Sequence, residues 1–244
     1  MDLLLVNYAM IFRIEWLNNA LIKFFGIIHN GIHNVLPNPN VSYGLTIIVV
    51  TIIIRGLLFP LNYKQIKSTL KMNEIQPEMK KLQERYKNNP QQQQKEMMKL
   101  YKEKGVNPMA GCLPLLLQWP ILIALYYVFM NLNTIDPNIG NVTFLGLKLM
   151  ATPTSNPLSW ILPIASGLTT YLSSSLMMSK SSQGSQAKQT NTMNIGMSLL
   201  ITYMGFKFTT ALVIYWVTNN LFQIFQTVIM QKIGTKKVSK EALE

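Results

Sequence analysis

Arg55 is the residue whose chemistry most needs explaining, because it is the one charged side chain in an apolar run from Gly44 to Leu61. An arginine at the centre of a membrane helix costs at least about 2.5–3.5 kcal/mol on insertion scales. Arg55 precedes Leu61, the end of this run, by about 9 Å along the helix axis. Its side chain therefore either extends to the nearer membrane surface or stands in a water-filled cavity among the helices, and both readings fit its position.

Uncharged polar side chains in other apolar segments favour the cavity. One set recurs at steps of three and four residues, which places it on one face of a helix: Trp216, Asn219, Asn220, Gln223, Gln226 and Thr227. Thr51 lies one turn before Arg55, and Gln118 lies in a further apolar segment. A third segment carries Thr169 and Thr170, followed by a run of serines that we interpret as helix-packing residues.

These residue types can attract and hydrate a ligand, but they are not suited to catalysis. No Asp or Glu occurs in any of the apolar segments, so Arg55 has no intramembrane carboxylate partner and no proton relay is available. Cys112 is the only cysteine, which excludes a disulfide within the chain and a CxxC metal pattern. His29 and His33 are four residues apart but have no evident third ligand. We therefore predict no enzyme activity, no metal and no cofactor.

Composition indicates the class of protein in which these residues are placed. The chain is 49% hydrophobic and only 13% charged, against about 25% charged in soluble domains. Several apolar stretches approach the roughly 18 residues that indicate a membrane span. The net charge of +12 lies mainly between these stretches, where membrane topology explains it better than nucleic-acid binding. We predict an all-α polytopic membrane protein.

Five transmembrane helices are predicted, at residues 44–61, 109–131, 158–178, 192–208 and 209–231. The N-terminal segment, 1–43, contains an amphipathic helix from Ile14 to Asn34 that we expect to lie in the membrane interface. Residues 62–108 form a basic helical hairpin, whose first helix is weakened by Pro77 and whose second helix begins at Pro90. Loops at 132–157 and 179–191 and a basic tail at 232–244 complete the chain.

Lysine and arginine counts predict the orientation. The hairpin, the 179–191 loop and the tail together hold 17 Lys and Arg residues, whereas the segments on the other side hold four. The positive-inside rule therefore places the hairpin and the C-terminal tail in the cytoplasm and the N-terminal segment outside. The first residues carry Asp2 and no evident cleavage site, so we expect them to be retained.

Three stretches of sequence resemble the YidC/Oxa/Alb family of membrane protein insertases. They are "NPMAGCLPLLLQWPILIALYY" at Asn107–Tyr127, "IIIRGLLFPL" at Ile52–Leu61 and "IYWVTNNLFQIFQ" at Ile214–Gln226. The resemblance covers roughly Ile14 to Gln231 and is to the compact Gram-positive type. One departure is Phe208-Thr209-Thr210, where the family usually has Phe-Pro and a small residue, so the turn before the last span is expected to be shaped differently.

The resemblance implies a hydrophilic groove that is open to the cytoplasm and lipid, is closed on the outside and has Arg55 at its centre. Gln118 and Trp216 would line it by their positions in the matched motifs. The full predicted lining is Thr51, Arg55, Gln118, Trp216, Asn219, Asn220 and Gln223. In such a groove the arginine would attract the acidic tail of an incoming membrane protein.

The same resemblance implies the location and the partners. We expect a multi-pass protein of the bacterial plasma membrane that inserts nascent membrane proteins into the lipid bilayer. The ribosome is an expected partner, the Sec translocase is a further candidate, and no specific nucleic-acid sequence is expected.

Two other functions remain as alternatives. A small-anion transporter would use Arg55 as its binding charge, but transporters usually show internal repeats or interrupted span pairs with coupling carboxylates, which this sequence lacks. A membrane scaffold without transport activity would have no reason to keep Arg55 among apolar residues.

Overall fold

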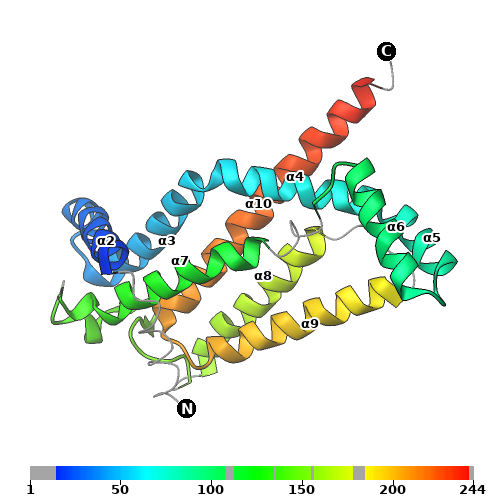
Figure 1. The fold of residues 1–244 in the computed structure, drawn as a ribbon. Helices are drawn as coiled ribbons and strands as arrows, with labels where there is room; N and C mark the ends of the chain where they lie inside the picture. Colours follow the sequence, from blue (N-terminus) through cyan, green and yellow to red (C-terminus); the bar gives the residue numbers. More distant parts are fainter. Residues whose placement is uncertain (1–14, 108–112, 135, 155–156, 178–184, 242–244) are drawn as a thin grey trace.

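The computed structural model describes residues 15–107, 113–134, 136–154, 157–177 and 185–241 (Figure 1). The regular structure in these ranges is helical, as predicted, apart from one short strand pair. The predictions for residues 1–14 and for Cys112 lie outside the described residues. Two of the described helices are long and apolar enough to cross a membrane, at Pro39–Leu57 and Thr210–Lys232, and Gln118–Met130 is a shorter apolar helix.

The amphipathic N-terminal helix, α2 (Glu15–Val35), packs against α3 (Pro39–Leu57) and α7 (Leu113–Met130). Figure 1 shows α2 beside the start of α3 and the end of α7. Phe25 is 1% exposed and meets Phe129 edge to face, with the ring centroids 6.3 Å apart. Trp16, in contrast, is 74% exposed. The predicted helix is confirmed, with one apolar side buried in the protein.

The first predicted span and the hairpin meet at a helix junction. Helix α3 ends at Leu57, and α4 (Phe59–Glu74) begins with Pro60 in its first turn. Proline has no N–H to donate, so it is tolerated at a helix start but not in a helix interior. The continuous helix therefore stops four residues before the predicted end of the span at Leu61.

The hairpin contains α5 (Gln76–Arg85) and α6 (Pro90–Glu103). The break between α4 and α5 falls at Ile75, two residues before the Pro77 that was predicted to weaken this helix. Helix α6 begins at the predicted Pro90, where Asn89 caps it by accepting a 3.1 Å hydrogen bond from the backbone N–H of Gln92. After α6 the chain turns at Gly105, whose φ of 59° suits glycine.

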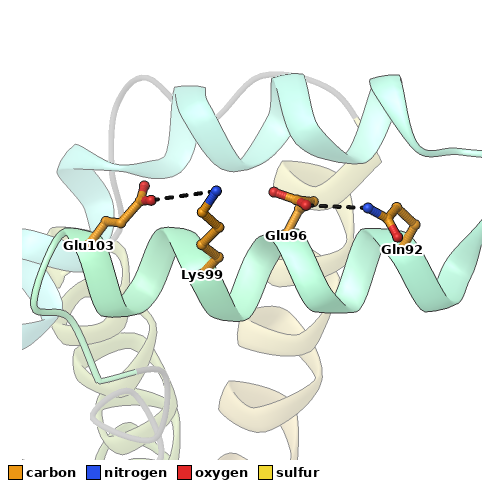
Figure 2. A network of polar contacts seen from close by, with 4 residues as sticks. All are labelled: Gln92, Glu96, Lys99 and Glu103. Carbon is orange, nitrogen blue, oxygen red and sulfur yellow. Dashed lines mark hydrogen bonds and ion pairs between the residues drawn. The ribbon is translucent and has the colours of Figure 1, made fainter.

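A small apolar core holds the hairpin together, and pairs of oppositely charged side chains lie on the surface of the hairpin. Four side chains from α5, α6 and their flanking residues are buried: Ile75, Met79, Leu100 and Val106. On α6, Gln92 donates to Glu96, and Lys99 pairs with Glu103 at 3.9 Å (Figure 2). Lys104 and Glu78 join the two ends of the hairpin at 2.6 Å.

The remaining helices are α8 (Ile161–Met177), α9 (Ser185–Gly205) and α10 (Thr210–Glu241). Helices α8 and α9 approach each other closely at Gly167. A Cβ at this position would lie 1.8 Å from the hydroxyl oxygen of Thr202, so the approach requires glycine. Helix α10 continues past residue 232, where the tail was predicted to begin. The loop before α8 holds three short helices and two strands: η2 (Leu132–Thr134), η3 (Ile139–Asn141), η4 (Pro157–Trp160), β1 (Thr143–Phe144) and β2 (Leu147–Lys148).

The loop also fixes the start of α10. Thr210 donates from both its backbone N–H and its hydroxyl to the carbonyl of Ala151, at 2.9 Å each. The N–H of Ala211 donates to the carbonyl of Leu149 at 2.9 Å. The Thr209-Thr210 departure from the family pattern thus supplies a side-chain contact to the loop. The strand pair, which the sequence did not predict, packs through Phe144 against Gly44 of α3.

Candidate functional site

Arg55 lies in the last turn of α3 and points to α10. Its Nε donates to Oδ1 of Asn219, and its Nη2 donates to Oε1 of Gln223 at 3.3 Å. Asn219 and Gln223 are four residues apart on α10, so both amides lie on the same face of that helix. No carboxylate pairs with Arg55 within the described part of the chain. Amide dipoles therefore orient the guanidinium without cancelling its positive charge.

A pocket open to the solvent surrounds this contact, and the space within it, with the adjoining solvent included, is about 580 Å³. Side chains from α3, α4, α7, α8 and α10 line it. Five of the seven predicted groove residues are among them: Thr51, Arg55, Gln118, Asn219 and Gln223. The wall also has an apolar part, formed by Ile54, Leu58, Ile66, Ile121 and Met177. The cavity thus offers polar and apolar surfaces to the same ligand.

Gln118 has a specific partner across the cavity. Its Nε2 donates to the hydroxyl of Tyr215 at 2.6 Å, which joins α7 to α10. Tyr215 is 2% exposed, and a buried tyrosine hydroxyl usually requires a hydrogen-bond partner. The hydroxyl of Thr51 donates to the carbonyl of Ile47 in its own helix at 2.6 Å. The hydroxyl hydrogen of Thr51 is therefore already used within its own helix, and Thr51 contributes to the wall mainly by its shape.

The other two predicted groove residues lie outside this cavity. Trp216 is 5% exposed and packs edge to face on Phe208, with centroids 5.8 Å apart. Asn220 turns to α8, where its Nδ2 donates to the hydroxyls of Thr170 and Thr169 at 2.8 and 3.3 Å. The polar face of α10 is therefore divided between two neighbours. Thr169 and Thr170, which were read as support for the cavity, bind helices to each other instead.

Four polar wall residues were not among the predicted groove residues, and one of them, Gln226, had been assigned to the polar face of its helix without a place in the groove. Asn62 and Gln65 lie on α4, in the segment that the sequence assigned to the hairpin, and Tyr215 reads as an ordinary aromatic residue. A signal for Asn62 and Gln65 existed, because positions 55, 58, 62 and 65 follow one another at steps of three and four residues. The face of α3 that carries Arg55 thus continues onto α4.

The described residues contain no cluster of side chains of the kind that usually binds a metal ion. No group of three or more His, Cys, Asp or Glu side chains comes together there. The chemistry available at the cavity is electrostatic attraction and hydrogen bonding.

Comparison with known proteins identifies the family. The 60Kd inner membrane protein family matches residues 35–237. A membrane protein insertase YidC from Clostridium tetani (strain Massachusetts / E88) is 49% identical over 220 residues, which cover 90% of this chain and 96% of the relative. The chain belongs to the YidC/Oxa family of membrane protein insertases.

Two further matches agree. A YidC insertase from Clostridium acetobutylicum is 52% identical over 230 residues, 94% of this chain and 89% of its own length. A crystal structure of an active YidC insertase, with its first transmembrane domain resolved, matches the fold with a TM-score of 0.64 at 30% identity. That match covers 86% of this chain and 45% of the other.

Membership of the YidC/Oxa family confirms the resemblance drawn from the three motifs. It makes the chain a bacterial membrane protein with a polytopic fold. It also makes the chain a membrane chaperone and not an enzyme.

Proposed function

We propose that this protein inserts nascent membrane proteins into the bacterial plasma membrane by way of the cavity around Arg55. The observation that carries the proposal is a guanidinium without a carboxylate partner in the described residues, in a cavity with polar and apolar walls. A cation held only by amide oxygens keeps its attraction for anions. The acidic residues of an incoming polar tail are anions of this kind.

The strength of that attraction suits a transient contact. Through an effective dielectric of about 20–80, one pair of charges a few ångströms apart is worth about 1–4 kcal/mol. This is enough to change a rate and small enough to release the tail. The apolar segment of the substrate then leaves sideways into lipid, driven by the burial of its own apolar surface. The step needs no nucleotide and no covalent chemistry.

The topology proposed for this function has five spans, at 44–61, 109–131, 158–178, 192–208 and 209–231. Helices α3, α7, α8, α9 and the first part of α10 overlap these ranges. The Lys and Arg count places the hairpin and tail in the cytoplasm and the N-terminal segment outside. In that orientation the groove opens to cytoplasm and lipid. The hairpin is then positioned to receive a nascent chain from the ribosome, with the Sec translocase as a further partner.

Site-specific photocrosslinking tests the proposal. A photoreactive residue in place of Gln118, which lines the cavity, should crosslink to a ribosome-stalled nascent membrane protein. The matched control is Leu145, a 77% exposed loop residue far along the chain from every wall residue. A stalled chain without an apolar segment should give no product at either site. Equal crosslinking from Gln118 and Leu145 would contradict the proposal.

A further inference from the structure

Three amide side chains in the wall of the cavity have atoms without a hydrogen-bond partner among the described residues. They are Asn62 and Gln65 on α4 and Gln226 on α10, which are 4–6% exposed. The unpartnered atoms, judged against the described part of the chain, are Nδ2 of Asn62, Nε2 of Gln65, and both Nε2 and Oε1 of Gln226. Buried polar groups are nearly always paired, and a group left unpaired carries a desolvation penalty. Such a group therefore calls for an explanation.

The other amides of the cavity do not share this property. Asn219 and Gln223 accept from Arg55, and Gln118 donates to Tyr215. The wall thus contains two sets of amides, one set engaged within the protein and one set with buried donors and an acceptor that have no partner among the described residues. Both sets border the same space. Asn62 and Gln65 of the second set continue the face of α3 and α4 that begins at Arg55, and Gln226 lies on α10.

The chemistry of a primary amide indicates its ligand. It carries donors and an acceptor without charge, so it matches the N–H and C=O of a peptide group. Every residue of an extended chain except proline presents the same pair of groups. An anion, in contrast, would favour cations, and Arg55 is the one cation in the cavity wall among the described residues. The apolar neighbours Leu58, Ile66 and Met177 accommodate side chains of varied shape beside a peptide backbone.

We propose that Asn62, Gln65 and Gln226 form a subsite that binds the main chain of the substrate's polar tail, whatever its sequence. The inference rests on the proposed insertase function and adds a second kind of recognition to it. Arg55 responds to the charge of the tail, and the three amides respond to its backbone. A neutral tail therefore still finds a binding surface in the cavity.

Ester substitution of the substrate backbone tests the subsite. The full-length protein in proteoliposomes receives a synthetic single-span substrate with a neutral tail, made either with normal peptide bonds or with ester bonds at successive tail positions. Each ester removes one N–H donor and leaves the side chains unchanged. We expect the ester form to insert more slowly, by about two- to tenfold for each hydrogen bond lost.

Leucine variants connect this effect to the three residues. Gln226→Leu should insert the normal substrate more slowly and should lose the difference between the normal and ester substrates, because Oε1 of Gln226 is the unpartnered acceptor for the N–H that the ester lacks. Gln65→Leu removes a donor to the tail carbonyls, which both substrates keep, so it should slow both substrates. Gln94→Leu, which removes an exposed amide on α6, should keep that difference. Thermal unfolding in detergent supplies a second readout. Removing an unpaired buried amide should leave the melting temperature unchanged or raise it, whereas a structural role predicts that it falls.

The outcomes distinguish a failure of the subsite from a failure of the proposed insertase function. Equal insertion of normal and ester substrates by the unmodified protein would overturn the subsite and leave the insertase function standing. A Gln226→Leu variant that slows both substrates by the same factor would show that its amide does not bind the backbone N–H of the substrate, and would also overturn the subsite. Insertion of neither substrate by the unmodified protein would contradict the proposed function itself.

Discussion

Charge is used in opposite ways in the cavity around Arg55 and in the hairpin of α5 and α6. In the cavity a single guanidinium is oriented by two amide oxygens and keeps its full charge. In the hairpin, charges of both signs pair with each other at the surface, as Lys99 does with Glu103 (Figure 2). Under the proposed function, the charge of Arg55 is left without a carboxylate partner so that it can attract an anion, whereas Lys99 and Glu103 pair at an exposed surface.

The two regions also differ in how they are stabilised. The main core combines buried residues of α2, α3, α7 and α10, among them Phe25, Ile47, Leu125 and Leu212. The cluster that holds α5 and α6 together has four buried apolar residues. Exposed ion pairs add about 0–1 kcal/mol each, so they do not compensate for a small core. We therefore expect the hairpin to open at a lower free energy than the bundle.

The largest expected effect comes from truncating one buried leucine in each region. Leu125 is 2% exposed and Leu100 is 6% exposed. Replacing either with alanine should lower the free energy of unfolding by about 2–5 kcal/mol. Leu125→Ala should lower protection across α3, α7 and α10 together in amide hydrogen exchange. Leu100→Ala should lower protection only in α4, α5 and α6. If Leu100→Ala also deprotected α10, the two regions would not be independent.

A smaller effect is expected from pH at the contact between α2 and α3. His29 is buried, and its pKa is lowered mainly by burial and further by the neighbouring His33, while Asp136 opposes the shift. Its ring stacks on Tyr43 and its Nδ1 lies 3.4 Å from the hydroxyl of Thr46. A histidine with a lowered pKa stabilises the fold fully above its unfolded pKa of about 6.5, and this contribution is lost as pH falls below that value.

Hydrogen exchange of α2 at pH 7.5 and pH 5 measures this effect. Protection of α2 should fall at the lower pH, while that of α10 stays the same. His29→Gln should remove most of the pH dependence, and His33→Gln, the matched control for the second ring, should remove less of it. A pH dependence that persists unchanged in His29→Gln would rule out this residue as its source.

The smallest effect is expected at the surface of the hairpin. Lys99 and Glu103 are 65% and 59% exposed and lie 3.9 Å apart. Lys99→Ala should therefore change the stability of the hairpin by less than about 1 kcal/mol, and added salt should reduce even that. Denaturant unfolding at low and high salt checks this. A loss comparable to that of Leu100→Ala would show that the ion pairs, and not the small core, hold the hairpin.

The sequence predicted those features that depend on local periodicity and on helix boundaries. Steps of three and four residues identified Asn219 and Gln223 on one face of α10, and Pro90 marked the start of α6. Hydropathy gave helices that overlap the expected ranges. These predictions succeeded because a helix fixes which of its residues share a face, whatever the rest of the fold does.

The features that were missed depend on how helices meet. The rotation of α10 against α3 and α8 decides that Gln223 contacts Arg55 whereas Asn220 contacts Thr170. Periodicity alone gives both amides the same face. The cavity extends to Gln65 because side chains of α4, which follows α3 after Leu58, also line it, whereas the charge of the next residues had favoured a solvent-exposed hairpin. Trp216 packs on Phe208, a contact that no local pattern predicts.

The central claim is that Arg55 attracts acidic substrate tails by its charge. An insertion assay in proteoliposomes tests it most directly by crossing three forms of the protein, unmodified, Arg55→Lys and Arg55→Ala, with two substrates that differ only in acidic or neutral tails. The account predicts that Arg55→Lys keeps most insertion, and that Arg55→Ala slows the acidic substrate far more than the neutral one, with a coupling of about 1–4 kcal/mol. Strictly additive effects, or equal losses in the lysine and alanine variants, would contradict it.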